Sequence, residues 1–192
     1  GTVRVGLLGH HQGANAAVAA ATLDALRDAG IASVTDDELR TGFAAARWPG
    51  RMELIPNALS GGDERDLLLD GAHNEDGAAA LAAALVDLAP QLRSATGTRD
   101  TPLVVIFAVM ADKSVAEVCA ALVKSPALRA AHVICTTVGD VRSLAPEQLA
   151  AAVRAAGLGA QVLIAANPNA ALLAAAEQSG PIIAAGSLYL VG

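Results

Sequence analysis

Short runs of Val, Ile and Leu alternate with alanine-rich amphipathic stretches through most of the chain after residue 50. Such runs are typical of strands buried on both faces of a parallel sheet, and the stretches between them repeat apolar residues at helical spacing. This alternation predicts an α/β fold with a mostly parallel sheet and helices on both faces. We predict strands at 51–56, 66–70, 103–109, 132–136, 161–165 and 182–185, and helices at 74–92, 115–124, 146–156 and 169–178.

The first 47 residues follow a different rhythm. Residues 2–8 have the apolar character of a strand that stops at Gly9, and an alanine-rich helix is expected over 12–29, where Gly30 ends it. Thr35 or Asp36 is suited to cap a second helix, with Glu38 completing the cap. Strand, helix and helix make no complete sheet, so we interpret 1–47 as the tail of a larger domain and 48–192 as a separate domain.

Polar residues follow several of the predicted strands at their carboxyl ends. Asp70 ends the strand at 66–70, Asp112 and Lys113 follow the strand at 103–109, and Arg142 follows the strand at 132–136. The carboxyl edge of an open α/β sheet is where ligands bind. Arg51 enters the first strand after the Pro-Gly turn and carries a planar fork of donors suited to phosphate or carboxylate.

The composition of the chain argues against several classes of partner and site. The net charge of −6 argues against a nucleic-acid partner, which would need clustered Lys and Arg. The longest apolar runs fall short of the ~20 residues of a membrane span, and the first residues lack the layout of a signal peptide. Cys119 and Cys135 show no metal-site spacing and are expected to be buried and reduced. We therefore expect a soluble cytoplasmic protein without metal ligands of its own.

Several separate motifs carry a family resemblance. The segments Trp48-Pro49-Gly50-Arg51 and Asp70-Gly71-Ala72-His73-Asn74 resemble the carboxy-terminal third of the folylpolyglutamate synthase and dihydrofolate synthase family, which belongs to the ATP-dependent Mur ligases. The segment from Gly9 to Ala17 is similar to the family's Gly-x-His-Gln-x-x-Asn-Ala motif, Asp112-Lys113 to its Asp-Lys segment, and Gly186 to Tyr189 to its closing strand. The resemblance spans nearly the whole chain and implies that 1–47 ends a central ATP-binding domain and 48–192 forms a Rossmann-like carboxy-terminal ligase domain.

The resemblance assigns nucleotide-binding roles to three residues. It implies that Arg51 and Asn15 contact ATP and that Asp70 contacts its ribose. Each residue also has a structural interpretation: Arg51 could pair with a nearby acid, Asp70 could cap the helix that begins near Asn74, and Asn15 could cap its own helix. The sequence leaves both interpretations open.

His73 lies near a helix amino terminus, where an imidazole could donate to a phosphate or an acyl phosphate, and we name it as the catalytic candidate. The family usually has Pro after the Asn, whereas this chain has Glu75. Asp112, Lys113 and Arg142 are candidate substrate contacts for a carboxylate of glutamate or folate, although a strand-end Asp-Lys also suits a helix start. Ser187 and Tyr189 are expected to be structural.

No Gly-x-x-x-x-Gly-Lys-Ser/Thr loop occurs in the sequence. In the resembling family that loop and the Mg²⁺ ligands lie in the amino-terminal part of the enzyme. We therefore expect a portion of a monomeric ligase that uses ATP and Mg²⁺ to join glutamate to dihydropteroate or reduced folates, and that is inactive by itself. A Mur-type ligase with a non-folate acceptor and a free-standing nucleotide-binding domain are the alternatives.

Overall fold

The computed structural model describes residues 2–59, 63–99 and 101–192. The chain divides into two compact units, the first ending at Pro49 and the second beginning at Gly50. This division falls close to the expected one between residues 47 and 48. That the first unit ends an ATP-binding domain stays a prediction. Residues 60–62, between the strands predicted at 51–56 and 66–70, lie outside the described part.

Two helices form the first unit, α1 (His11–Asp28) and α2 (Asp36–Ala45). The expected cap is present on α2, because the Glu38 amide donates to Thr35 Oγ1 at 3.2 Å and the Thr35 amide donates to Glu38 Oε2 at 2.8 Å. This reciprocal pair satisfies two of the amides that a helix start leaves without partners. Gly30 follows α1 with φ +70°, the left-handed geometry that ends helices.

The strand expected at 2–8 is wrong. Residues 2–8 contain no strand, and the segment is tied to α2 by the Gly6 amide, which donates to the Phe43 carbonyl at 2.8 Å. An apolar run becomes a strand only where another strand offers a ladder of hydrogen bonds. The described part of the first unit contains no such partner.

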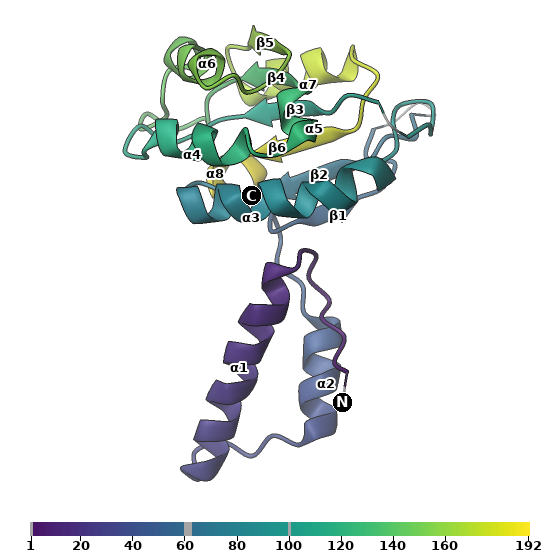
Figure 1. Ribbon diagram of the computed structural model, residues 1–192, viewed down its shortest axis with the longest axis vertical. Helices are drawn as coiled ribbons and strands as arrows, with labels where there is room; N and C mark the ends of the chain where they lie inside the picture. The colour runs from purple at the N-terminus through teal and green to yellow at the C-terminus, as the bar shows by residue number, and fades with distance from the viewer. Residues whose placement is uncertain (1, 60–62, 100) are drawn as a thin grey trace. The chain divides into compact units, whose positions relative to one another are not determined.

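A six-stranded sheet organises the second unit, in the order β1-β2-β6-β3-β4-β5 (Figure 1). The six strands predicted after residue 50 are all present; β6 has the predicted ends, and the other five are shorter than predicted. β1 pairs antiparallel with β2, and every other pair is parallel. The strands are β1 (Glu53–Ile55), β2 (Leu67–Asp70), β3 (Val104–Phe107), β4 (His132–Cys135), β5 (Gln161–Ile164) and β6 (Ile182–Ala185).

Alternation along each strand sends side chains to two separate cores. Val105 and Phe107 of β3 join one apolar cluster with α3, α4 and α6, whereas Val104 and Ile106 join another with α7. Both faces of the sheet are therefore covered, as expected for parallel strands. The helices are α3 (Glu75–Leu88), continued by the 3₁₀ turn η1 (Ala89–Gln91), then α4 (Val115–Leu122), α6 (Pro146–Ala155) and α7 (Pro168–Ala176).

Two further short helices were not expected, α5 (Pro126–Arg129) and α8 (Leu188–Val191). Gly186 to Tyr189, which resemble the family's closing strand, follow a strand and do not form one, because β6 ends at Ala185 and the chain turns at Gly186, where φ is +108°. The Tyr189 amide donates to Ser187 Oγ at 3.1 Å, which caps α8. Each of these helices has four residues, too few to show helical periodicity.

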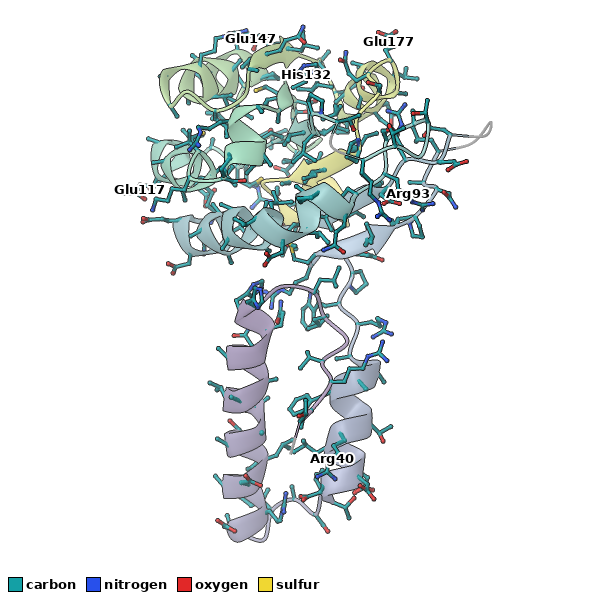
Figure 2. The ribbon with its side chains drawn as sticks, turned by 45° about the vertical axis from the view of Figure 1, so that its right-hand side comes forward. Arg40, Arg93, Glu117, His132, Glu147 and Glu177 are labelled. Carbon is teal, nitrogen blue, oxygen red and sulfur yellow. The ribbon has the colours of Figure 1, made fainter. Side chains whose placement is uncertain are left out.

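Buried polar groups form hydrogen bonds and ion pairs at the amino-terminal edge of the sheet. The Arg65 guanidinium is buried and donates to the Ala175 carbonyl at 2.9 Å and the Ala176 carbonyl at 3.2 Å, which caps the end of α7. Asp63 pairs with Arg65 Nε at 2.7 Å. The next residue, Asp66, pairs at 3.0 Å with Arg93, which follows η1 and is labelled in Figure 2. These contacts are structural and lie at the edge opposite the predicted ligand edge.

Both cysteines are buried and free, as predicted. Burial raises the pKa of the Cys119 thiol to about 11 and that of the Cys135 thiol to about 12. A thiol acts as a nucleophile only as its thiolate, so neither cysteine is suited to catalysis near neutral pH.

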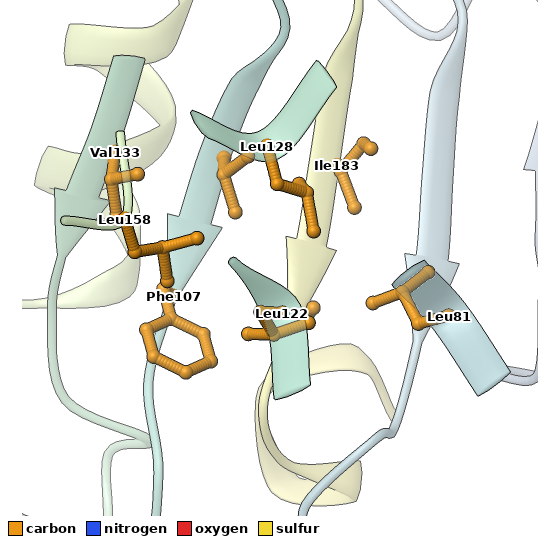
Figure 3. A pocket seen from close by; sticks show the side chains of 9 residues that line it. Leu81, Phe107, Leu122, Leu128, Val133, Leu158 and Ile183 are labelled. Carbon is orange, nitrogen blue, oxygen red and sulfur yellow. The ribbon is translucent and has the colours of Figure 1, made fainter. Parts of the chain in front are cut away.

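A small apolar void of about 10 Å³ lies between the sheet and the helices of the larger core (Figure 3). Its walls include Leu81 of α3, Phe107 of β3 and Ile183 of β6, and no polar atom lines it. A cavity of this size and character stays dry, so its walls lose some of their packing contacts.

Replacing Leu81 with Ala tests this core directly. Leu81 is 2% exposed, and its truncation would enlarge the void, so we expect the free energy of unfolding to fall by about 2–5 kcal/mol. Val86 lies on the same helix but is 61% exposed, so Val86→Ala should change stability by no more than about 0.5 kcal/mol. Urea denaturation of the two variants measures both values. Equal effects would contradict the packing described for α3.

Candidate functional site

A pocket of about 240 Å³ opens at the carboxyl edge of the sheet. The parallel register places the ends of four strands together: Asp70 of β2 is level with Ala185 of β6, which is level with Phe107 of β3, which is level with Cys135 of β4. The segments that follow these strands, including the first residues of α8, supply the lining residues, which are His73, Met110, Asp112, Lys113, Arg142, Ser187, Leu188 and Tyr189.

Two of these loops are joined by backbone pairing. The Ala111 amide donates to the Arg142 carbonyl at 2.8 Å, and Met110 forms an isolated antiparallel bridge with Ser143. The Ser143 hydroxyl also accepts from the Val138 amide at 3.0 Å. The loop after β3, which carries Lys113, and the loop after β4, which carries Arg142, are therefore fixed to each other.

A hydrogen bond to the backbone fixes the tautomer of neutral His73, which lines the pocket. Its Nδ1 lies 2.7 Å from the Gly71 carbonyl oxygen, which can only accept, so Nδ1 carries the proton. In the neutral ring Nε2 is then an acceptor with a free lone pair. The half-buried imidazole is thus suited to take a proton from a ligand group, whereas it donates from Nε2 only when charged.

Arg142 is held by an acidic and an aromatic neighbour. Its Nε donates to Asp140 Oδ1 at 3.0 Å, and its Nη2 lies 3.3 Å from Asp140 Oδ2 and 3.4 Å from the Tyr189 hydroxyl. The guanidinium carbon lies 5.5 Å from the centre of the Tyr189 ring. Hydrogen bonds from Arg142 hold the pKa of the Asp140 carboxyl below its usual value, and the same contacts raise the pKa of Arg142.

The pocket combines charges of both signs. Lys113 Nζ lies 3.3 Å from the Asp112 carboxylate, and both side chains reach solvent. The cations Lys113 and Arg142 and the anion Asp112 line the pocket, and Asp140 pairs with Arg142. A site of this kind suits a ligand that itself carries both signs, such as an amino acid.

Asp70 lies beside the pocket rather than in it. The Met52 amide donates to its Oδ2 at 2.9 Å and the Ala72 amide donates to its Oδ1 at 2.9 Å, and the residue is 8% exposed. Met52 has φ +48°, so the carboxylate holds a strained turn next to the exposed Arg51. Asp70 therefore has a clear structural function, and a ribose contact stays a prediction.

Asn15 belongs to the first unit. It lies in the first turns of α1, where its Nδ2 donates to Gln12 Oε1 at 3.1 Å, and Gln12 Nε2 is 2.8 Å from His11 Nε2. Asn15 is exposed on this helix. Its nucleotide contact stays a prediction.

Sequence reasoning found four of the pocket residues and missed four. The structure gathers His73, Asp112, Lys113 and Arg142 in one place, as their positions at strand ends suggest. Ser187 and Tyr189 were expected to be structural, and the structure places both in the wall. The same strand-end rule applied to β6 would have identified Ser187, whereas Tyr189 enters through α8, which has no sequence signal.

Neither a metal cluster nor a membrane span is found in the described residues. Within 2–59, 63–99 and 101–192, no three His, Cys, Asp or Glu side chains are grouped so as to hold a metal ion. In the same ranges no helix combines the length and apolar character needed to cross a bilayer.

Comparison with known proteins places this geometry in a family. The Mur ligase glutamate ligase domain matches residues 50–188. A probable bifunctional folylpolyglutamate synthase/dihydropteroate synthase of Halobacterium salinarum is 33% identical over 96% of this chain and 20% of its own length. A dihydrofolate synthase/folylpolyglutamate synthase of Mycobacterium tuberculosis is 36% identical over 76% of this chain and 26% of its own.

A solved structure agrees with these relatives. The Mycobacterium tuberculosis folylpolyglutamate synthase complexed with ADP and AMPPCP superposes with a TM-score of 0.76 and 29% identity, over 97% of this chain and 39% of that one. This chain thus spans well under half the length of each of these proteins. The predicted fold and the predicted resemblance are both confirmed, and the chain belongs to the Mur ligase family, with its second unit forming the glutamate ligase domain.

Proposed function

We propose that this chain is the carboxy-terminal portion of an ATP-dependent ligase that adds L-glutamate to dihydropteroate, to reduced folates, or to both. The observation that carries the proposal is the pocket of mixed charge at the carboxyl edge of a glutamate ligase domain. The names of the relatives supply the acceptor class, since they are folylpolyglutamate and dihydrofolate synthases.

The pocket offers complementary partners for each charged group of glutamate. Lys113 Nζ and Arg142 Nη1 are donors suited to carboxylates. Asp112 and the Nε2 of His73 are acceptors suited to the amino group. Lys113, His73 and Arg142 come from loops after three different strands, so the folded sheet fixes the spacing among them. We assign Asp112, Lys113 and Arg142 to substrate binding.

His73 would act as the base in the second half of the reaction. The acceptor carboxylate attacks the γ-phosphate of ATP, giving an acyl phosphate and ADP. The amine of glutamate then attacks the acyl carbon, an amide bond forms, and inorganic phosphate leaves. The amine must lose a proton in this step, and neutral His73 Nε2 has the lone pair to take it, because Nδ1 is already committed to Gly71.

Arg51, Asp70 and Asn15 are the proposed nucleotide contacts. Arg51 is exposed beside the turn that Asp70 fixes, and a guanidinium presents a planar set of donors that suits phosphate oxygens. We propose that Asp70 contacts the ribose in addition to accepting hydrogen bonds from the Met52 and Ala72 amides. Structures of the relatives with ADP and AMPPCP support ATP as the nucleotide.

The proposal also covers the metal ion, the activity of the chain by itself, and its location and oligomeric state. Mg²⁺ would screen the phosphates, and we expect its ligands outside the described residues, in which no three His, Cys, Asp or Glu side chains are grouped to hold an ion. Without a phosphate-binding loop the chain should be inactive by itself. We further propose a cytoplasmic monomer.

Arg142→Ala in the intact protein that carries this chain tests the substrate assignment. Loss of a charged hydrogen bond to a carboxylate costs about 1.5–3 kcal/mol, so the KM for glutamate should rise about 10- to 100-fold, with the KM for ATP unchanged. Val141→Ala is the matched control, because Val141 is the adjacent residue and is fully exposed outside the pocket. Assays with dihydropteroate, tetrahydrofolate and cell-wall nucleotide precursors identify the acceptor. Turnover of the precursors alone would contradict a folate ligase.

Arg51→Ala tests the nucleotide assignment in the same protein. The loss of a charge-assisted contact to phosphate should raise the KM for ATP about tenfold, while the KM for glutamate stays the same. Arg129 is exposed on α5, away from the carboxyl edge, so Arg129→Ala serves as the control. Unchanged ATP kinetics in Arg51→Ala would remove this residue from the nucleotide site.

A further inference from the structure

Burial does not fix the side chain of Arg142. Its side chain is 61% exposed, and an exposed arginine ordinarily samples many rotamers. A ligand that binds such a side chain must first restrict it, which lowers affinity. The contacts around Arg142 remove this freedom before a ligand arrives.

Asp140 fixes the edge of the guanidinium that Nε and Nη2 form. Its carboxylate accepts from Arg142 Nε, lies within reach of Nη2, and also accepts from the Arg142 backbone amide at 2.8 Å. The backbone amide of Arg142 holds the Asp140 carboxylate, and this carboxylate holds the Arg142 guanidinium. The guanidinium is therefore fixed to the loop that carries it. Nη1 has no hydrogen-bond partner within the described part of the chain and is left to face a ligand.

Tyr189 holds the guanidinium through its ring and its hydroxyl. The guanidinium carbon is 5.5 Å from the ring centre, within the range of a cation–π contact, and the hydroxyl lies 3.4 Å from Nη2. This contact joins α8, after β6, to the loop after β4. Nothing local in the sequence brings residues 142 and 189 together.

Two glycines let α8 lie close enough for this contact. A Cβ at Gly71 would collide with Leu188 Cδ2, and a Cβ at Gly50 would collide with Val191. Both glycines belong to the loops that carry Arg51 and His73. The position of Tyr189 is therefore set by the same loops that form the rest of the site.

We propose that Asp140 and Tyr189 are positioning residues that fix the guanidinium of Arg142 before a ligand binds. Of the guanidinium nitrogens, Nη1 is then the one that donates to a carboxylate of the incoming amino acid. The inference deepens the proposed function and rests on it for the identity of the ligand. It assigns Tyr189 a role in substrate affinity, although the residue lies at the rim and does not need to touch glutamate.

Tyr189 is the better residue to test. Removing the Asp140 charge would loosen the fork and also strengthen the field that attracts a carboxylate, so the two effects oppose each other. Tyr189 is uncharged and 60% exposed, so its replacement removes the support of Arg142 without changing the charge of the pocket, and we expect the fold to stay intact.

The experiment compares Tyr189→Leu, Tyr189→Phe and Val141→Ala in the intact protein. A cation–π contact at an exposed site is worth about a threefold change in affinity, so Tyr189→Leu should raise the KM for glutamate about threefold with kcat nearly unchanged. Tyr189→Phe keeps the ring and should recover most of the loss. Val141→Ala should match the parent protein.

A second measurement separates this inference from the proposed function. The NMR order parameter of the Arg142 Nε–Hε bond should lie near the rigid value of about 0.85 and fall toward about 0.6 in Tyr189→Leu. A mobile Arg142 in the parent protein, or no change on Tyr189→Leu, overturns the inference whatever the enzyme assay shows. If Arg142 is rigid and Tyr189→Leu loosens it, but neither Arg142→Ala nor Tyr189→Leu alters glutamate kinetics, the proposed glutamate site fails instead.

Discussion

The in-register parallel pairing of β2, β6, β3 and β4 is the constraint on which the site depends. Residues far apart in the sequence become neighbours because each follows a strand that ends at the same level. His73, Lys113, Arg142 and Tyr189 share no local motif, yet their loops meet at one edge. A parallel sheet buried on both faces cannot slip by one residue without exposing its core, so the same burial that stabilises the sheet fixes the pocket.

Local contacts in the loops then position the side chains that the sheet brings to one edge. Asp70 ties the turn at Met52 to the end of β2, and the Gly71 carbonyl selects the Nδ1–H tautomer of neutral His73. The loops after β3 and β4 are joined to each other, and α8 packs against two glycines. Each of these contacts acts on a residue beside a proposed ligand contact. The ligand-facing atoms are thereby positioned by groups that do not themselves need to touch a ligand.

The sequence predicts this fold where burial leaves a strong pattern and fails where structure depends on a partner. The apolar run of β6 is predicted to the residue because both of its faces are buried. Residues 2–8 have a similar apolar character but no neighbouring strand, so pattern alone misleads there. For the site, strand-end placement suffices to find Lys113 and Arg142. It cannot show that two amides occupy Asp70, or that Tyr189 lies over Arg142, because both depend on contacts across the folded sheet.

A crystal structure of the intact protein with bound L-glutamate would test the central claim most directly. We expect one glutamate carboxylate within hydrogen-bonding distance of Arg142 Nη1 and Lys113 Nζ, the amino group directed to His73 Nε2, and Arg142 still held by Asp140 and Tyr189. Glutamate bound away from this edge, or a guanidinium that leaves Tyr189 to reach its ligand, would contradict the account.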